Sequence, residues 1–204
     1  MAFLKSSSSF TRFRITEPVP QQLWGEIADK LKQFAFRDID DTSDERSLGW
    51  VCFEDMLDTE WRAIPPHKGE YLAFSLRLDT RRVPPAVLKK HTGLALKAEE
   101  ARNREQGKKY IARERKKEIR EQVELKLRAR TLPIPAEFNV VWNTTENIVF
   151  FASTQGKMIE AFQEHFTKTF NLDLDQLTPY GLAAKILGEN GLAKLDRLEP
   201  TRFV

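Results

Sequence analysis

The sequence predicts an α+β fold with antiparallel or mixed sheets, packed helices and a long, basic, protruding helical arm. Three observations favour this class. Short apolar runs with two-residue periodicity occur near both ends, helical segments separate them irregularly, and one highly charged helical segment interrupts the chain. A doubly wound sheet would need a regular alternation of strands and helices, which this order lacks.

Residues 1–83 are expected to form the N-terminal part of an α+β body. Phe10, Phe13 and Ile15 alternate with polar residues, which predicts a strand within residues 2–16. Apolar residues at helical spacing then predict an amphipathic helix over about residues 20–35. Alternation and β-forming residues predict the next two strands, at residues 47–53 and 71–79.

Residues 132–204 are expected to form the C-terminal part of the same body. Two apolar runs flank a polar tetrapeptide, which is typical of a hairpin. The predicted elements are strands at 137–142 and 147–152 joined by a turn at 143–146, a helix at 155–169, a strand at 170–174 and a helix at 180–187.

Residues 84–131 form the predicted arm. Between Pro84 and Arg130 there are 15 Lys and Arg residues but only 7 Asp and Glu residues, which gives this segment a charge of +8. The whole chain carries only +3, so the remainder carries −5. This uneven division of charge favours a polyanion as the partner.

Two apolar stripes give the arm its helical character, with a fully polar stretch around Gly107 between them. Proline at the start suits the first turn of a helix, whereas glycine inside a helix costs roughly 1 kcal/mol relative to alanine. A single straight helix and a hairpin both fit, and we favour two helices with a break within residues 103–109. The stripes are Val87, His91, Leu94, Ala98 and Ala101, followed by Ala112, Ile119, Val123 and Leu127.

Clustered cations on the arm are suited to contacting phosphates, and no helix-turn-helix, zinc-finger or RNA-recognition signature indicates base reading. One alternative is a solvated arm whose charges only keep it soluble. The other is a coiled-coil module without a role in DNA binding, which contacts another protein through Leu94, Ala98 and Ala101 and through Ile119, Val123 and Leu127. The candidate phosphate contacts are Lys89, Lys90, Lys97, Arg102, Arg104, Lys108, Lys109 and Arg113.

No motif makes a positive case for an enzyme, a cofactor or a metal site. The acidic segment 38–60 lacks the glycine and the final glutamate of a calcium loop, and the three histidines have no ligand spacing. Paired acids in this segment leave open a further interpretation, a magnesium-dependent nuclease. The single cysteine, Cys52, and the absence of a long apolar run indicate a soluble protein of the reducing cytosol.

The order of several short motifs resembles the recombination-associated RdgC family of bacteria. None of these motifs is specific alone, and their order and spacing carry the resemblance. They are Phe3-Leu4-Lys5, Phe10 to Arg14, Ala35-Phe36, Gly49-Trp50, Pro85-Ala86-Val87-Leu88-Lys89, Leu132-Pro133, Trp142 with the hairpin after it, and Ala152-Ser153 before a helix with Lys157.

This resemblance implies a protein of the cytoplasm and nucleoid that binds DNA without sequence preference. Members of the family are ring-shaped homodimers that encircle double-stranded DNA through a positively charged central hole. They restrain strand exchange by the RecA recombinase because they occupy the DNA. The same resemblance accounts for the missing catalytic residues.

The chain departs from the family in length, since roughly the last third of a family member is missing. A shortened member is therefore expected, and closure of a complete ring is in doubt. An aromatic residue just after the Leu-Pro pair is associated with one contact of the ring. Phe138 is the candidate equivalent here, and Ile134 is the other.

Overall fold

The computed structural model describes residues 8–42, 44–62, 64–107 and 110–199. The chain divides into two compact units. We call one the body unit, formed by Met1–Ala35, Gly49–Leu76 and Glu137–Val204, and the other the arm unit, formed by Phe36–Leu48 and Arg77–Ala136. The predicted arm at 84–131 belongs to the arm unit.

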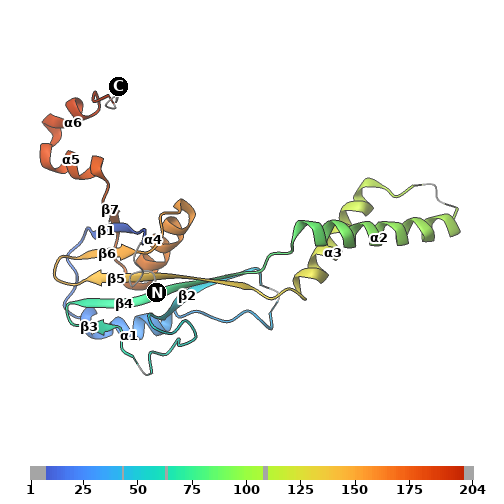
Figure 1. The fold of residues 1–204 in the computed structure, drawn as a ribbon, viewed down its shortest axis with the longest axis horizontal. Helices are drawn as coiled ribbons and strands as arrows, with labels where there is room; N and C mark the ends of the chain where they lie inside the picture. Colours follow the sequence, from blue (N-terminus) through green and yellow to red (C-terminus); the bar gives the residue numbers. More distant parts are fainter. Residues whose placement is uncertain (1–7, 43, 63, 108–109, 200–204) are drawn as a thin grey trace. The chain divides into compact units, whose positions relative to one another are not determined.

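A seven-stranded sheet runs through the described part of the chain, in the order β2-β4-β5-β6-β1-β7 with β3 paired to β4 (Figure 1). Its recorded pairings β1–β6, β1–β7, β3–β4 and β5–β6 are antiparallel, and the predicted α+β class is confirmed. The strands are β1 (Thr11–Ile15), β2 (Arg46–Cys52), β3 (His67–Lys68), β4 (Tyr71–Thr80), β5 (Ile134–Asn143), β6 (Ile148–Phe151) and β7 (Leu174–Gln176).

In the part of the body unit that the structure describes there are four helices: α1 (Leu23–Gln33), α4 (Gly156–Phe170), α5 (Pro179–Leu187) and α6 (Glu189–Leu195). Helices α1 and α4 contact each other, and each buries one apolar stripe. Helices α5 and α6 also pack together, and the Tyr180 hydroxyl donates to Asp196 Oδ1 at 2.7 Å. No helix in the described ranges is long and apolar enough to cross a bilayer.

An aromatic cluster forms the core of the body unit. Strands β1, β2, β4, β5 and β6 each contribute one fully buried ring, and these rings meet the phenylalanines of α4. Phe151 and Phe162 stack with their ring centroids 4.2 Å apart. Burial of so many large rings is the main stabilising term of this unit. The five strand residues are Phe13, Trp50, Phe74, Trp142 and Phe151.

The predicted hairpin between β5 and β6 is confirmed. Asn143 Oδ1 accepts hydrogen bonds of 3.0 Å from the backbone N–H groups of Thr145 and Glu146. Asn147 then adopts a φ of 53°, which asparagine tolerates better than most residues. The polar tetrapeptide therefore forms the turn because its own side chains and backbone satisfy each other.

Several predicted boundaries need correction. Within the predicted strand 2–16, only Thr11–Ile15 is a strand, and residues 1–7 lie outside the described ranges. The strand predicted at 170–174 is wrong, because α4 continues to Phe170 and Asn171 ends it in the left-handed conformation. Strand β7 follows only at Leu174. The short elements β3 and α6 were not predicted from the sequence.

His165 is a titratable group packed into this aromatic core. Its Nε2 atom donates to the Phe34 carbonyl oxygen at 3.3 Å, and its ring centroid lies 4.8 Å from that of Trp50. Burial lowers the pKa of His165 below its usual range. The unfolded chain takes up this proton near pH 6.5, so the free energy of unfolding should fall as the pH drops below about 6.5. Urea unfolding at a series of pH values measures this fall.

The matched variant is His165→Gln, which keeps a hydrogen-bond donor but does not titrate. Its free energy of unfolding should depend less on pH than that of the wild type over the same interval. An identical pH dependence of the two proteins would show that His165 contributes nothing to it.

Candidate nucleic-acid interface

Helices α2 (Pro85–Glu105) and α3 (Arg113–Arg128) belong to the arm unit and pack against each other (Figure 1). Pro85 occupies the first turn of α2, where its missing N–H costs nothing. After α2, the Gln106 N–H bonds to the carbonyl of Arg102, and Gly107 has a φ of 72°. The predicted break near 103–109 is therefore confirmed, since glycine readily adopts the conformation that ends a helix.

The stripe predicted to pack on α2 is wrong. Leu94 is 56% exposed and Val87 is 38% exposed, and His91, Ala98 and Ala101 are exposed as well. The partly covered residues of α2 form a different series with steps of three or four residues, which includes Leu88, Thr92, Leu96, Glu99 and Asn103. The stripe predicted on α3 is correct in its main part, because Ile119 is buried and Val123 and Leu127 are partly covered.

An ion pair between Arg115 and Glu99 links the two helices. Arg115 Nε on α3 lies 2.7 Å from Glu99 Oε1 on α2, and the same guanidinium bonds to Glu118 at 2.9 Å. Glu99 therefore faces α3 because it has a cation to meet there. An apolar stripe cannot reveal this kind of pairing, which is why the orientation of α2 was predicted incorrectly.

Six of the eight predicted phosphate contacts fall on described residues, and all six are exposed. Among the described residues, none of the six has a carboxylate within 4.0 Å. Their charge is therefore available to a partner. Lys108 and Lys109 lie outside the described residues. The six are Lys89, Lys90, Lys97, Arg102, Arg104 and Arg113.

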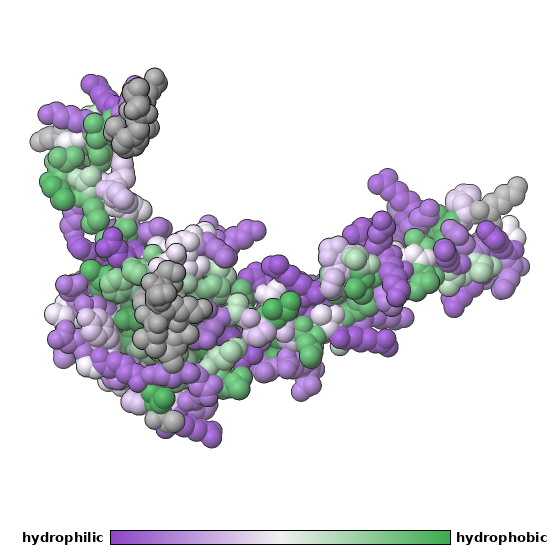
Figure 2. Space-filling model, viewed as in Figure 1, coloured by the Kyte–Doolittle hydropathy of each residue, from purple (hydrophilic) through white to green (hydrophobic). Residues whose placement is uncertain are grey.

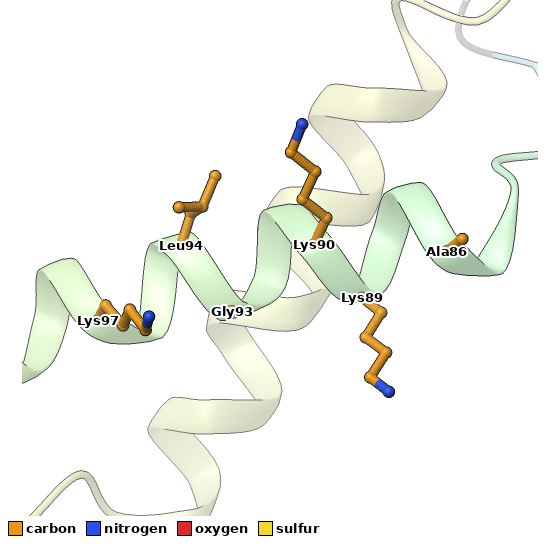
Figure 3. A pocket seen from close by; sticks show the side chains of 6 residues that line it. All are labelled: Ala86, Lys89, Lys90, Gly93, Leu94 and Lys97. Atoms are coloured by element: carbon orange, nitrogen blue, oxygen red, sulfur yellow. The ribbon is translucent and has the colours of Figure 1, made fainter.

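Lys90, Lys97 and Arg104 follow one another at seven-residue intervals on α2. Seven residues are two turns of an α-helix, so these cations share a face and lie about 10 Å apart along the axis. Figure 3 shows Lys90 and Leu94 pointing to one side of α2 and Lys89 to the other, with Gly93 between them. We call the cations Lys90, Lys97 and Arg104 the α2 row.

A shallow groove of about 460 Å³ lies along this exposed side of α2. It is lined by Lys89, Lys90 and Lys97, by the apolar residues Ala86 and Leu94, and by Gly93, which has no side chain. The space-filling view shows mostly hydrophilic residues over α2 and α3, with hydrophobic patches among them (Figure 2). Cations beside small residues allow a phosphate backbone to approach the helix closely.

A row of cations also lies on α3, and only Arg113 of this row is among the predicted phosphate contacts. Arg113, Lys116 and Arg120 occupy positions i, i+3 and i+7, so they share a face of α3. Lys116 and Arg120 are exposed, and neither forms an ion pair with another described residue. Their helical spacing was the signal that could have identified them. Other arm cations are neutralised: Lys117 lies 3.8 Å from Glu121, and Arg128 pairs with Glu124 and Glu45.

Two buried arginines organise the non-helical part of the arm unit. Arg77 and Asp79, 8% and 2% exposed, form a bidentate pair with contacts of 2.8 and 2.7 Å. The Arg77 guanidinium also lies 4.1 Å from the centroid of the Phe36 ring. A two-point ion pair of this kind fixes side-chain geometry in a way that a single contact does not.

Arg81 holds the acidic loop that follows Phe36. Its guanidinium donates to the carbonyl oxygens of Ile39 at 2.7 Å, Asp40 at 3.1 Å and Thr42. These three backbone oxygens are thus bound by an internal cation. In the described part of the chain, no three His, Cys, Asp or Glu side chains gather as a metal site would require.

The two candidate dimer contacts differ in exposure. Phe138 is partly covered, and its ring centroid lies 5.8 Å from that of Phe151. Ile134, at the start of β5, is 61% exposed. Of the two, Ile134 therefore has the larger free surface.

The fold and the exposed cations together define an α+β protein with a basic helical hairpin. Residues 8–188 match the model of the family described as "Putative exonuclease, RdgC". Because the match covers most of the sequence, the chain belongs to the RdgC family. This is a family of recombination-related nucleoid proteins. A comparison with curated proteins gave no match.

Proposed function

We propose that this protein binds double-stranded DNA without sequence preference, and that cations of α2 and α3 contact the DNA phosphates. The observation that carries the proposal is the set of six exposed arm cations without a described carboxylate partner. Cations that are not neutralised internally release counterions when they meet phosphates, and this release drives non-specific binding. The membership in the RdgC family supports the same conclusion.

The composition of the hairpin favours duplex DNA over a single strand. Proteins that bind single strands combine cations with aromatic rings on which the bases stack. Between Pro84 and Arg130 the only aromatic residue of the Phe, Trp and Tyr class is Tyr110. A surface that is rich in cations but poor in stacking rings is suited to the regular phosphate track of a duplex.

Membership in the family supports a proposal for the wider role. By occupying duplex DNA in the cytoplasm, at the nucleoid, the protein restrains strand exchange by a RecA-type recombinase, and it does so as a homodimer. Phe138 and Ile134 are the proposed dimer contacts. We assign no catalytic step to the chain.

Two alternatives are kept for testing because a specific observation favours each. The description of the family contains the word exonuclease, which favours a test for magnesium-dependent cleavage of DNA. The exposed stripe with Val87 and Leu94 favours a protein contact of α2. The stripe with Ile119 and Val123 no longer serves such a contact, because it faces α2.

The direct test is fluorescence anisotropy with labelled duplexes of several unrelated sequences, beside a single strand of equal length. We expect similar affinities for all duplexes and weaker binding of the single strand. Strong discrimination between duplexes, or no binding of DNA, would contradict the proposal. Incubation with Mg²⁺ tests cleavage, and inhibition of RecA-driven strand exchange tests the wider role.

A further inference from the structure

A second groove of the arm unit lies between α2 and α3. It has a volume of about 510 Å³, and Arg120 of α3 lines it together with residues of α2. We call it the inter-helix groove. Its α2 wall is largely apolar, with Pro85, Leu88 and Leu96, but it also carries Lys89 and Thr92.

Two cations from different helices thus meet at one groove. Lys89 and Arg120 are both exposed, and neither has a carboxylate partner among the described residues. Two like charges that line the same concave surface repel each other unless an anion lies between them. The groove therefore has the charge that an anionic group would complement.

Thr92 provides a second, independent observation. Its hydroxyl is covered by neighbouring atoms and has no hydrogen-bond partner. A hydroxyl in a helix commonly donates to the carbonyl four residues earlier, and an unsatisfied one costs about 1–3 kcal/mol. The Thr92 side chain lines the inter-helix groove, so a rotation about its Cα–Cβ bond would bring the hydroxyl to a ligand oxygen there, which would supply the missing acceptor.

Gly93 has no side chain, and it lines both the inter-helix groove and the shallow groove along the exposed side of α2. A Cβ atom at this position would contact nothing within 4 Å. Space is therefore available for a bulky group beside Lys89.

We propose that Lys89 and Arg120 hold one backbone phosphate of duplex DNA between α2 and α3, with the Thr92 hydroxyl as a further donor. This inference rests on the proposed function and names a specific contact within it. The arginine contributes a planar fork that can bind two phosphate oxygens, and the lysine contributes a compact charge on the other side.

The test measures the salt dependence of duplex binding for Lys89→Gln combined with Arg120→Gln. If both cations meet one phosphate, the slope of log K against log salt should become shallower by about 0.9. The matched control combines Lys97→Gln with Lys116→Gln, an exposed cation on each helix outside the inter-helix groove. That pair should change the slope by about 1.8, because two phosphates are lost.

A change of about 1.8, or no change, for the Lys89 and Arg120 pair would overturn the shared contact. Failure of the wild-type protein to bind duplex DNA would instead contradict the proposed function itself. Wild-type binding is measured before that of any variant, so the two failures can be distinguished. Circular dichroism of each variant checks that the hairpin remains helical.

Thr92→Val gives an additional readout that a structural role alone would not produce. The replacement has nearly the same shape and removes the unsatisfied hydroxyl, so the melting temperature should be unchanged or raised. The affinity for duplex DNA should nevertheless fall several-fold. An unchanged affinity would remove Thr92 from the proposed contact.

Discussion

Reversal of the three charges of the α2 row should weaken duplex binding by a factor of about one hundred or more. Each phosphate contact contributes roughly a factor of five at 0.15 M salt, and an introduced glutamate also repels the phosphate. The variant carries Lys90→Glu, Lys97→Glu and Arg104→Glu. Because the three side chains are exposed and glutamate favours helices, the free energy of unfolding should change little.

The matched control reverses three exposed lysines of the body unit: Lys32, Lys185 and Lys194. Both variants change the net charge by the same amount, so a general electrostatic effect would weaken binding equally. Anisotropy titrations at one salt concentration compare them. Equal losses in the two variants would show that the hairpin has no special role in DNA binding.

Asp79→Ala should destabilise the protein by about 3–5 kcal/mol, because it leaves the buried guanidinium of Arg77 without its bidentate partner. This is a large part of the free energy of unfolding of a typical domain, which is about 5–15 kcal/mol. Urea unfolding followed by circular dichroism measures the change.

A double variant, Arg77→Met with Asp79→Leu, separates the cost of the lone charge from the value of the pair. Removal of both charges should destabilise the protein less than Asp79→Ala alone, since no uncompensated charge remains buried. If Asp79→Ala lowers the free energy of unfolding by less than about 1 kcal/mol, the Arg77–Asp79 pair does not stabilise the protein as its burial and geometry indicate.

Much of the fold could be predicted from local patterns. The alternation of Phe13 and Ile15, the i, i+4 series of α1 and the polar turn before Asn147 each depend on neighbours in the sequence. The break at Gly107 was predictable for the same reason, because glycine in a polar stretch favours the end of a helix.

The orientation of α2 could not be predicted in this way. Val87 and Leu94 lie seven residues apart and Leu88 and Leu96 lie eight apart. Both separations are close to two helical turns, so periodicity alone does not choose between the two stripes. Contacts with α3 decide which stripe is covered. Glu99, which pairs with Arg115 of α3, belongs to the stripe with Leu88 and Leu96. Buried charges are equally hidden from the sequence, since Arg77 and Asp79 in a strand suggest a solvent-facing side.

The candidate site was predicted in its chemistry more than in its geometry. The charge of the arm indicated phosphate contacts, and the described cations of that prediction are exposed. The shared position of Lys89 and Arg120 depends on how α2 packs on α3. That packing is a long-range property that neither helix reveals by itself.

The salt dependence of wild-type binding to a random duplex is the most direct measurement of phosphate contact by the hairpin. With about six cations engaged, the slope of log K against log salt should be about −5, and the variant with the reversed α2 row should have a slope shallower by about 2.7. A wild-type slope near zero, or equal slopes for the two proteins, would contradict binding through these cations.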